Sequence, residues 1–225
     1  MTGLVTETFD FDGGRRVTVH VPDGTPEAVV YAGDGQLIAP WGADLSSVDA
    51  PPTLVVGVHR LDTPGTSGDP ESDDPELRRL AEYSPGFAPA TFAAHENFLL
   101  SEVRSWVRAR FGVDPPRART AICGVSAGGE LSLALGLRHP DLFGHVFSAS
   151  PGGGFRPSDE WPSPLPGAYL VAGRQEPFFL DNASRWADAL RAAGAEVVFE
   201  EREGDHGDPF WRAEFPRMVA WAFGR

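Results

Sequence analysis

The chain has 225 residues, 41% of them hydrophobic, which suffices for one domain with a single hydrophobic core. Its formal net charge of −13 argues against nucleic acid or an anionic membrane surface as a partner. No apolar run is long enough to span a membrane, and the first residues lack the basic and apolar regions of a signal peptide. We therefore expect a cytoplasmic protein.

The chain begins with a predicted β-hairpin. Residues 5–11 and 16–22 alternate apolar and polar side chains, and residues 12–14, with the sequence DGG, are a turn signal between them. Continuous apolar runs follow at residues 28–32 and 53–58. Such runs are typical of strands that are buried on both faces, as in a parallel sheet.

Three longer segments connect or follow these strands. Residues 37–49 could supply a crossover helix, although Pro40 and Gly42 interrupt it. From residue 60 to residue 90 the composition changes to Pro, Gly, Ser and acidic residues, which predicts a long loop near a functional site. Residues 91–111 carry apolar side chains close to helical spacing, with arginines late in the segment, and we expect a helix there.

Strands and helices alternate in the second half of the chain. The predicted strands are residues 121–123, 146–149, 168–173 and 196–200, and the predicted helices are residues 130–137, 182–193 and 211–223. This alternation after an antiparallel hairpin predicts a three-layer α/β sandwich with a mostly parallel central sheet and an antiparallel edge. We expect residues 1–225 to form one domain, with its ligand beyond the carboxyl ends of the strands.

A candidate nucleophile stands between one of these strands and the helix after it. Residues 124–128 have the sequence GVSAG, which places Ser126 at the apex of a sharp turn. The turn forces this serine into a strained backbone conformation, and Gly124 and Gly128 leave room for strand and helix to approach. The motif alone is weak evidence, but its place between strand and helix predicts an exposed, reactive hydroxyl.

A serine hydroxyl needs a base, and a histidine is the usual one at neutral pH. Of the six histidines, only His206 follows the last predicted strand and precedes the last helix, in the loop after Glu203. His59 and His95 could also reach a site, but they precede the serine in the chain. A triad in the order serine, acid, histidine therefore favours His206 as the base.

The acid that orients the imidazole should follow the strand at residues 168–173. Glu176 is first in line, and Asp181 is its main rival, although a carboxylate there could equally cap the next helix. Asp205 adjoins the histidine and points elsewhere, while Asp208 could cap the last helix. The geometry that a triad requires favours Glu176 over Asp181.

Acyl transfer also requires hydrogen-bond donors for the developing oxyanion. The backbone N–H of Ala127, directly after the nucleophile, is one candidate. The second should come from the glycine-containing loop after residues 28–32, where Gln36 is the first choice and Gly35 the next. The alternative is that Asp34 and Gly35 only form a turn.

Several short segments together resemble a known family. They are Tyr31–Gln36, Arg79–Tyr83, Gly124–Gly129, His139–Phe143, Ala172–Pro177 and Gly204–His206. In this order, and across about residues 25–223, the chain is similar to the enterochelin (siderophore) esterase and esterase D group of α/β-hydrolases. The resemblance implies a three-layer α/β-hydrolase sandwich and a serine esterase.

The resemblance also implies roles for individual residues. Ser126 would be the nucleophile, His206 the base and Glu176 the acid. The amides of Gln36 and Ala127 would form the oxyanion hole. The residues that would border the substrate are Asp34, Gly35, Arg79 and Glu82, of which the last two match an Arg-x-x-Glu motif.

The first hypothesis is therefore hydrolysis of a small carboxylic ester, of siderophore, aryl or lactone type, through an acyl-enzyme. We assign no metal ligands and no cofactor. A second hypothesis keeps the acyl-enzyme but transfers the acyl group to an alcohol or amine. A third is a binding protein that retains only the fold, which the presence of all three residue types in the expected order disfavours.

Overall fold

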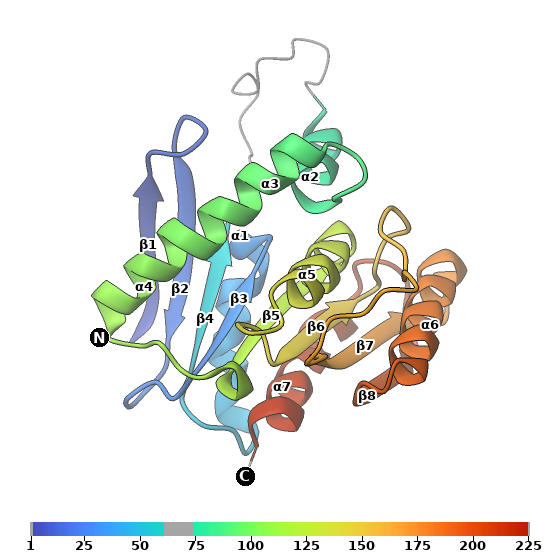
Figure 1. Ribbon diagram of the computed structural model, residues 1–225. Coiled ribbons are helices and arrows are strands. Elements are labelled where there is room, and N and C mark those ends of the chain that lie inside the picture. Colours follow the sequence, from blue (N-terminus) through green and yellow to red (C-terminus); the bar gives the residue numbers. More distant parts are fainter. Residues whose placement is uncertain (1, 61–73, 225) are drawn as a thin grey trace.

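One mixed sheet forms the centre of the molecule (Figure 1). The computed structural model describes residues 2–60 and 74–224, and within them eight strands lie in the order β1-β2-β4-β3-β5-β6-β7-β8. The strands are β1 (Gly3–Phe9), β2 (Arg15–Val21), β3 (Ala28–Ala32), β4 (Thr53–Val58), β5 (Thr120–Val125), β6 (His145–Ala149), β7 (Gly167–Gly173) and β8 (Val197–Arg202). Strands β1, β2 and β4 pair antiparallel, and all other neighbours pair parallel. This arrangement confirms the predicted sheet and its antiparallel edge.

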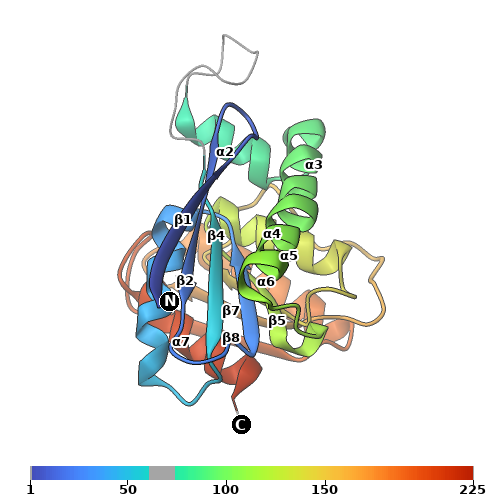
Figure 2. The same cartoon turned by 90° about the vertical axis from the view of Figure 1, so that its left-hand side faces the viewer.

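Helices cover both faces of this sheet. They are α1 (Gly35–Ile38), the 3₁₀ segment η1 (Ala39–Ser47), α2 (Pro75–Tyr83), α3 (Pro89–Asn97), the π-helical segment η2 (Phe98–Val103), α4 (Arg104–Phe111), the 3₁₀ turn η3 (Arg117–Arg119), α5 (Ala127–Arg138), α6 (Pro177–Ala192) and α7 (Phe210–Phe223). Figure 2 shows α3, α4 and α5 on one side of the sheet and α1 and α7 on the other. Every helix in the described ranges is too short or too polar to cross a lipid bilayer.

Two hydrophobic clusters hold the three layers together. One contains Val29 of β3 and Leu131 of α5, and the other contains Val30 of β3 and Phe215 of α7. Successive residues of β3 thus point to opposite faces, and all five of its residues are buried. The continuous apolar runs of the sequence follow from this burial on both faces.

Two connections differ from the sequence-based expectation. Residues 37–49 do not form one α-helix, because the short helix α1 passes directly into the 3₁₀ segment η1. Pro40 lies at the start of that segment, and Gly42 packs so closely on His20 that an added Cβ would stand 2.4 Å from the ring. The expected crossover is present, but the proline and the close contact at Gly42 favour the 3₁₀ form.

The expected loop at residues 60–90 contains a helix. Residues 61–73 lie outside the described residues, but α2 begins at Pro75, directly after Asp74, whose side chain accepts a hydrogen bond from the Glu76 N–H at 2.9 Å. Proline is favoured at the first helical position and aspartate at the N-cap. The composition that indicated a loop therefore includes the start signal of a helix.

Candidate active site

Polar side chains gather where four neighbouring parallel strands end. Ser126 directly follows β5, Ser150 follows β6, Glu176 follows β7 and His206 follows β8. Because these strands are parallel and adjacent, their carboxyl ends meet at one edge of the sheet. Residues that are up to 80 positions apart in the chain (206 − 126) are thereby brought into contact.

The turn after β5 holds Ser126 in a strained conformation. Its φ and ψ angles are 58° and −124°, outside the regions that side chains with a Cβ normally occupy. A Cβ on Gly124 would stand 1.8 Å from the carbonyl oxygen of Gly128, so only glycine lets strand and helix approach this closely. The Ser126 N–H donates to the Ala149 carbonyl at 2.9 Å, which anchors the turn to β6.

His206 lies between a hydroxyl and a carboxylate. Its Nε2 is 3.0 Å from Ser126 Oγ, and its Nδ1 is 2.6 Å from Glu176 Oε2. A proton on Nδ1 would be donated to Glu176 and would leave Nε2 free to accept from the serine hydroxyl. The imidazole stacks on the ring of Phe179, with the ring centroids 3.7 Å apart, and it meets the ring of Trp211 edge-on, with the centroids 4.9 Å apart. These contacts fix the plane of the imidazole.

Glu176 is buried, and both of its carboxylate oxygens have hydrogen-bond partners. Besides His206, its carboxylate accepts from the Ser150 hydroxyl at 2.5 Å and from the Gly173 N–H at 2.6 Å. Ser150 in turn accepts from the indole N–H of Trp211 at 2.8 Å. Contacts with His206, Ser150 and Gly173 thus fix the orientation of this carboxylate. Sequence reasoning missed Ser150 and Trp211, because only the order of the strands in the sheet brings them to Glu176.

The rival acids lie elsewhere. Asp181 is exposed within α6, and the structure brings Glu176 rather than Asp181 to the imidazole. Asp208 accepts the backbone N–H of Asp205 at 2.7 Å, and Asp205 accepts that of His206 at 2.7 Å. These two aspartates therefore shape the loop that carries the histidine.

The two expected oxyanion donors lie in the first turns of two helices. Ala127 is the first residue of α5, and Gln36 is the second residue of α1. Backbone N–H groups in the first turn of a helix have no intrahelical acceptor, so both amides can donate to a ligand. The Gln36 side chain accepts from the Arg60 N–H at 3.4 Å.

Asp34 and Arg79 form a buried pair beside these turns. Arg79 donates to the Asp34 carboxylate from Nε at 3.0 Å and from Nη2 at 2.7 Å. The same Nη2 donates to the Val125 carbonyl at 2.9 Å, and the Asp34 N–H donates to the Tyr83 hydroxyl oxygen at 2.7 Å. Arg79 thereby joins the loop after β3 to the turn that carries Ser126.

Of the four residues expected to border the substrate, one lines the pocket beside Ser126 and three do not. Only Arg79 lines the pocket beside Ser126. Asp34 is buried and engaged by Arg79, and Gly35 packs on β4 so closely that an added Cβ would stand 2.1 Å from the Gly57 carbonyl oxygen. Glu82 is buried outside this pocket and pairs with Arg15 at 2.5 Å, because the buried guanidinium requires a counter-charge.

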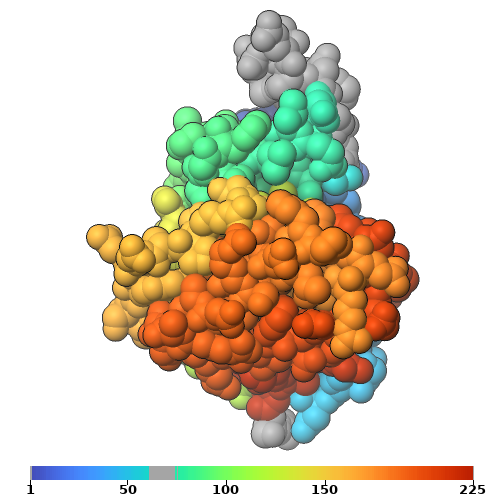
Figure 3. All heavy atoms as spheres, turned by 90° about the vertical axis from the view of Figure 1, so that its right-hand side faces the viewer, coloured from blue at the N-terminus to red at the C-terminus, as the bar shows by residue number. Residues whose placement is uncertain are grey.

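A pocket of about 510 Å³ opens beside Ser126 and Ala127. We call it the Ser126 pocket. Its walls come from α2, residues 84–87, the glycine loop at residues 152–154 and the start of α6. Figure 3 shows this face of the molecule. The teal and green atoms of α2 and residues 84–87 lie towards the top, and the yellow and orange atoms of residues 152–154 and α6 lie below them. Phe87 and Phe178 line the pocket and remain more than half exposed.

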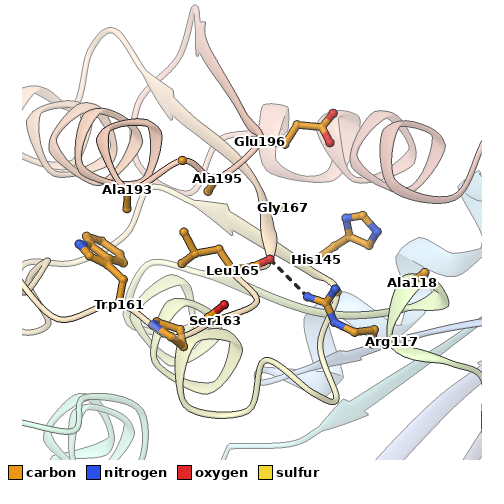
Figure 4. A pocket seen from close by; sticks show the side chains of 13 residues that line it. Arg117, Ala118, His145, Trp161, Ser163, Leu165, Gly167, Ala193, Ala195 and Glu196 are labelled. Carbon is orange, nitrogen blue, oxygen red and sulfur yellow. Dashed lines mark hydrogen bonds between the residues drawn. The ribbon is translucent and has the colours of Figure 1, made fainter.

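A second pocket, of about 580 Å³, lies at the opposite edge of the sheet (Figure 4). It includes His145 and Gly167, the first residues of β6 and β7. Arg117 donates there to the carbonyl of Leu165, and burial lowers the pKa of His145. The hydrogen-bonded Ser126 and His206 lie instead at the carboxyl ends of the parallel strands. We therefore take the Ser126 pocket as the candidate active site, although its volume is smaller than that of the second pocket. Within the described residues, no three His, Cys, Asp or Glu side chains gather to hold a metal ion.

Solved structures with this fold include several esterases. A ferulic acid esterase from Anaeromyces mucronatus, in complex with ferulic acid, is 19% identical with a TM-score of 0.74, and the match covers 100% of this chain and 91% of that one. The enterochelin esterase from Shigella flexneri is 19% identical with a TM-score of 0.75, over 96% of this chain and 57% of that one. The BES protein from Bacillus cereus is 14% identical with a TM-score of 0.69, over 100% and 96%. At these identities the likeness shows the fold, which is that of the α/β-hydrolases.

The sequence itself matches a family model. Residues 11–161 match the Esterase family, whose description is "Putative esterase". No curated protein sequence matched the chain. The family match covers more than half of the chain and includes the serine turn. The chain therefore belongs to the Esterase family, and it is a carboxylic ester hydrolase with the α/β-hydrolase fold.

Proposed function

We propose that the chain cleaves its ester through an acyl-enzyme formed on Ser126. The observation that carries this proposal is the continuous series of hydrogen bonds from Ser126 through His206 to Glu176. A hydroxyl next to the free nitrogen of an imidazole can lose its proton as it attacks a carbonyl carbon. The buried carboxylate stabilises the imidazolium that results.

Attack on the carbonyl creates a negatively charged oxygen. The amides of Ala127 and Gln36 are the proposed donors to this oxygen, because each lies in the first turn of a helix next to the nucleophile or its neighbouring loop. The pair of Asp34 and Arg79 supports this arrangement, since Arg79 ties the loop before Gln36 to the Val125 carbonyl. Losing one such donor typically costs about 10²–10³ in kcat.

His206 then gives this proton to the leaving alcohol, and the acyl group stays on Ser126. In the second half of the reaction, His206 takes a proton from a water molecule that attacks the acyl-enzyme, and the carboxylic acid is released. The leaving group must therefore face His206. The Ser126 pocket is lined by Ser126 and Ala127 but not by His206, which supports placing the acyl group in that pocket. The His206 side chain is 31% exposed, so water can reach the acyl-enzyme, and this favours hydrolysis over transfer to another acceptor.

The walls of the Ser126 pocket support an aryl acyl group. Leu80, Phe87, Phe178 and Phe179 line it, and flat rings of a substrate pack well against such side chains. An aryl ester is therefore our proposal within the broader class of aryl, siderophore-type and lactone esters. The solved esterases that share the fold include one with bound ferulic acid, which is itself an aryl acid.

Active-site labelling tests the nucleophile. A fluorophosphonate should label the folded protein at one site per chain, on Ser126, and Ser126→Ala should abolish both labelling and ester hydrolysis. We expect the loss in kcat to be about 10⁴–10⁶-fold. The thermal midpoint of the variant should stay close to that of the wild type, which serves as the control for folding. Folded wild-type protein that stays unlabelled would overturn the proposal.

A further inference from the structure

Glu130 is a buried carboxylate in the wall of the Ser126 pocket. It lies in the first turn of α5, four residues after Ser126, and is 2% exposed. Its Oε1 accepts from the Gly154 N–H at 2.9 Å. Its Oε2 has no hydrogen-bond partner among the described residues, and no described cation pairs with this carboxylate. The proposed triad does not use it.

A second polar group, which can both donate and accept a hydrogen bond, lies beside Gly154. Ser84, the C-cap of α2, is 2% exposed, and its Oγ also lacks a partner among the described residues. A Cβ built on Gly154 would stand 2.5 Å from Ser84 Oγ and 2.9 Å from Glu130 Oε2. Two side chains from different elements thus converge beside one glycine in the pocket wall.

The arrangement calls for a donor. Buried acceptors without donors cost free energy, and a carboxylate oxygen costs more than a neutral one. Glu130 lies in the first turn of α5, where the helix dipole interacts favourably with a carboxylate. A ligand that donates a hydrogen bond would satisfy Oε2, whereas a ligand that only accepts would bring two acceptors together.

The other charged side chains of the pocket are already engaged. Arg79 pairs with Asp34 and with Glu76, whose side chain is 64% exposed, and Arg156 donates to Asn182 at 2.6 Å. Most of the remaining wall is apolar, and an ammonium group would lose its hydration there at greater cost than a hydroxyl group. A hydroxyl donates to the carboxylate and can accept from, or donate to, the serine hydroxyl.

We infer that Glu130 and Ser84 bind a hydroxyl group on the acyl part of the ester and so determine which esters are cleaved. This inference rests on the proposed function, in which the acyl group occupies the Ser126 pocket. A site built to bond a hydroxyl discriminates strongly against the analogue that lacks it, because the buried acceptors are then left without a donor. The preferred substrate is thus an aryl ester whose acyl ring carries a hydroxyl.

The test compares matched p-nitrophenyl esters. The acyl groups are phenylacetate, its three ring-hydroxylated isomers and the corresponding methyl ethers, which have no hydroxyl donor. We expect one hydroxyl isomer to have a kcat/KM at least about tenfold above those of phenylacetate and its own methyl ether. Equal values within twofold for all seven esters would overturn the inference.

Variants assign the preference to the two side chains. Glu130→Gln keeps an oxygen for the Gly154 N–H but can replace the second acceptor with an amide donor, so the ratio of hydroxyl ester to methyl ether should fall to about one. Ser84→Ala removes only a hydroxyl group and should lower the same ratio by a few fold. Glu102→Gln, which removes an exposed carboxylate from η2, is the matched control and should keep the wild-type ratio.

The outcomes separate this inference from the proposed function. If no ester is hydrolysed and Ser126 is not labelled, the proposed function fails. If all seven esters are hydrolysed through Ser126 without a hydroxyl preference, only the inference fails. A preference that survives in both Glu130→Gln and Ser84→Ala also overturns it. The ratio of kcat/KM for the hydroxyl ester to that for its methyl ether is measured on one protein preparation, so it does not depend on the fraction of the variant that is folded. If Glu130→Gln does not fold at all, Ser84→Ala still tests the inference.

Discussion

Among the described residues, two of the clusters that combine a histidine with a buried glutamate differ in their surroundings. One joins Glu176 to His206 at the ends of β7 and β8. The other lies between the edge hairpin and helices α2 and α3, where Arg15 contacts both Glu82 and His95. Both glutamates are less than 5% exposed, so burial alone does not distinguish the clusters.

The histidines differ in exposure and in their charged neighbour. The His206 side chain is 31% exposed, and its Nδ1 lies 2.6 Å from the carboxylate of Glu176. His95 is 1% exposed, and burial followed by the nearby Arg15 charge lowers its pKa to about 3. The comparison shows that access to solvent and an anionic partner, rather than residue type, make His206 the candidate base.

The glutamates differ in the same way. Burial raises the pKa of Glu82 even though Arg15 opposes the rise, because the loss of hydration exceeds the attraction of the ion pair. Glu176 instead meets three neutral or titratable donors, from His206, Ser150 and Gly173. The Glu82 carboxylate thus lies against a buried arginine, whereas the Glu176 carboxylate lies against the imidazole of the proposed base.

The largest expected effect comes from breaking the Glu176 cluster, which we propose to be catalytic. Glu176→Gln should lower kcat by about 10³–10⁴-fold, because the imidazole loses the anion that orients it and stabilises its charged form. Asp181→Asn, which amidates the exposed carboxylate of α6, the helix that follows Glu176, should keep wild-type kcat. Steady-state kinetics on a p-nitrophenyl ester measures both. Full activity of Glu176→Gln would remove Glu176 from the mechanism.

The next effect comes from breaking the Arg15 cluster. Glu82→Ala should lower the free energy of unfolding by about 3–5 kcal/mol, because it removes the buried counter-charge of Arg15 and leaves only Asp12, whose side chain is 42% exposed. Asp114→Ala removes the partner of Arg104 at the surface, where both side chains are 39% exposed, and should cost at most about 1 kcal/mol. Urea unfolding compares the two. Equal losses would show that the Arg15 cluster contributes no more than a surface pair.

The smallest effect concerns pH. The pKa of His95 lies below its unfolded value of about 6.5, so the unfolded chain binds more protons and stability falls as the pH drops from about 6.5 towards 3. The contribution between pH 7 and pH 5 is about 2 kcal/mol. His95→Asn cannot titrate, so its free energy of unfolding should fall less over this range by that amount. Parallel profiles for the wild type and the variant would contradict the assignment.

The sequence alone determined the parts of the protein that depend on local pattern. Continuous apolar runs identified β3 and β4, because burial on both faces leaves no alternation. The GVSAG turn located Ser126, because glycine is needed where strand and helix touch. Chain order placed Glu176 and His206 after the strands that position them. The sequence analysis did not predict helix α2, because a proline such as Pro75 is typical of loops. It indicates the start of a helix only when Asp74 before it is identified as the N-cap.

Only the tertiary structure decided the contacts between distant segments. Ser150 and Trp211 reach Glu176, and Ser84 reaches Glu130, because neighbouring strands and helices carry them there. Glu82 lies in the Arg15 cluster and does not line the Ser126 pocket, since Arg15, 67 residues earlier in the chain, lies buried beside it. Such pairings depend on strand order and on the burial of individual charges, and neither leaves a local signal in the sequence.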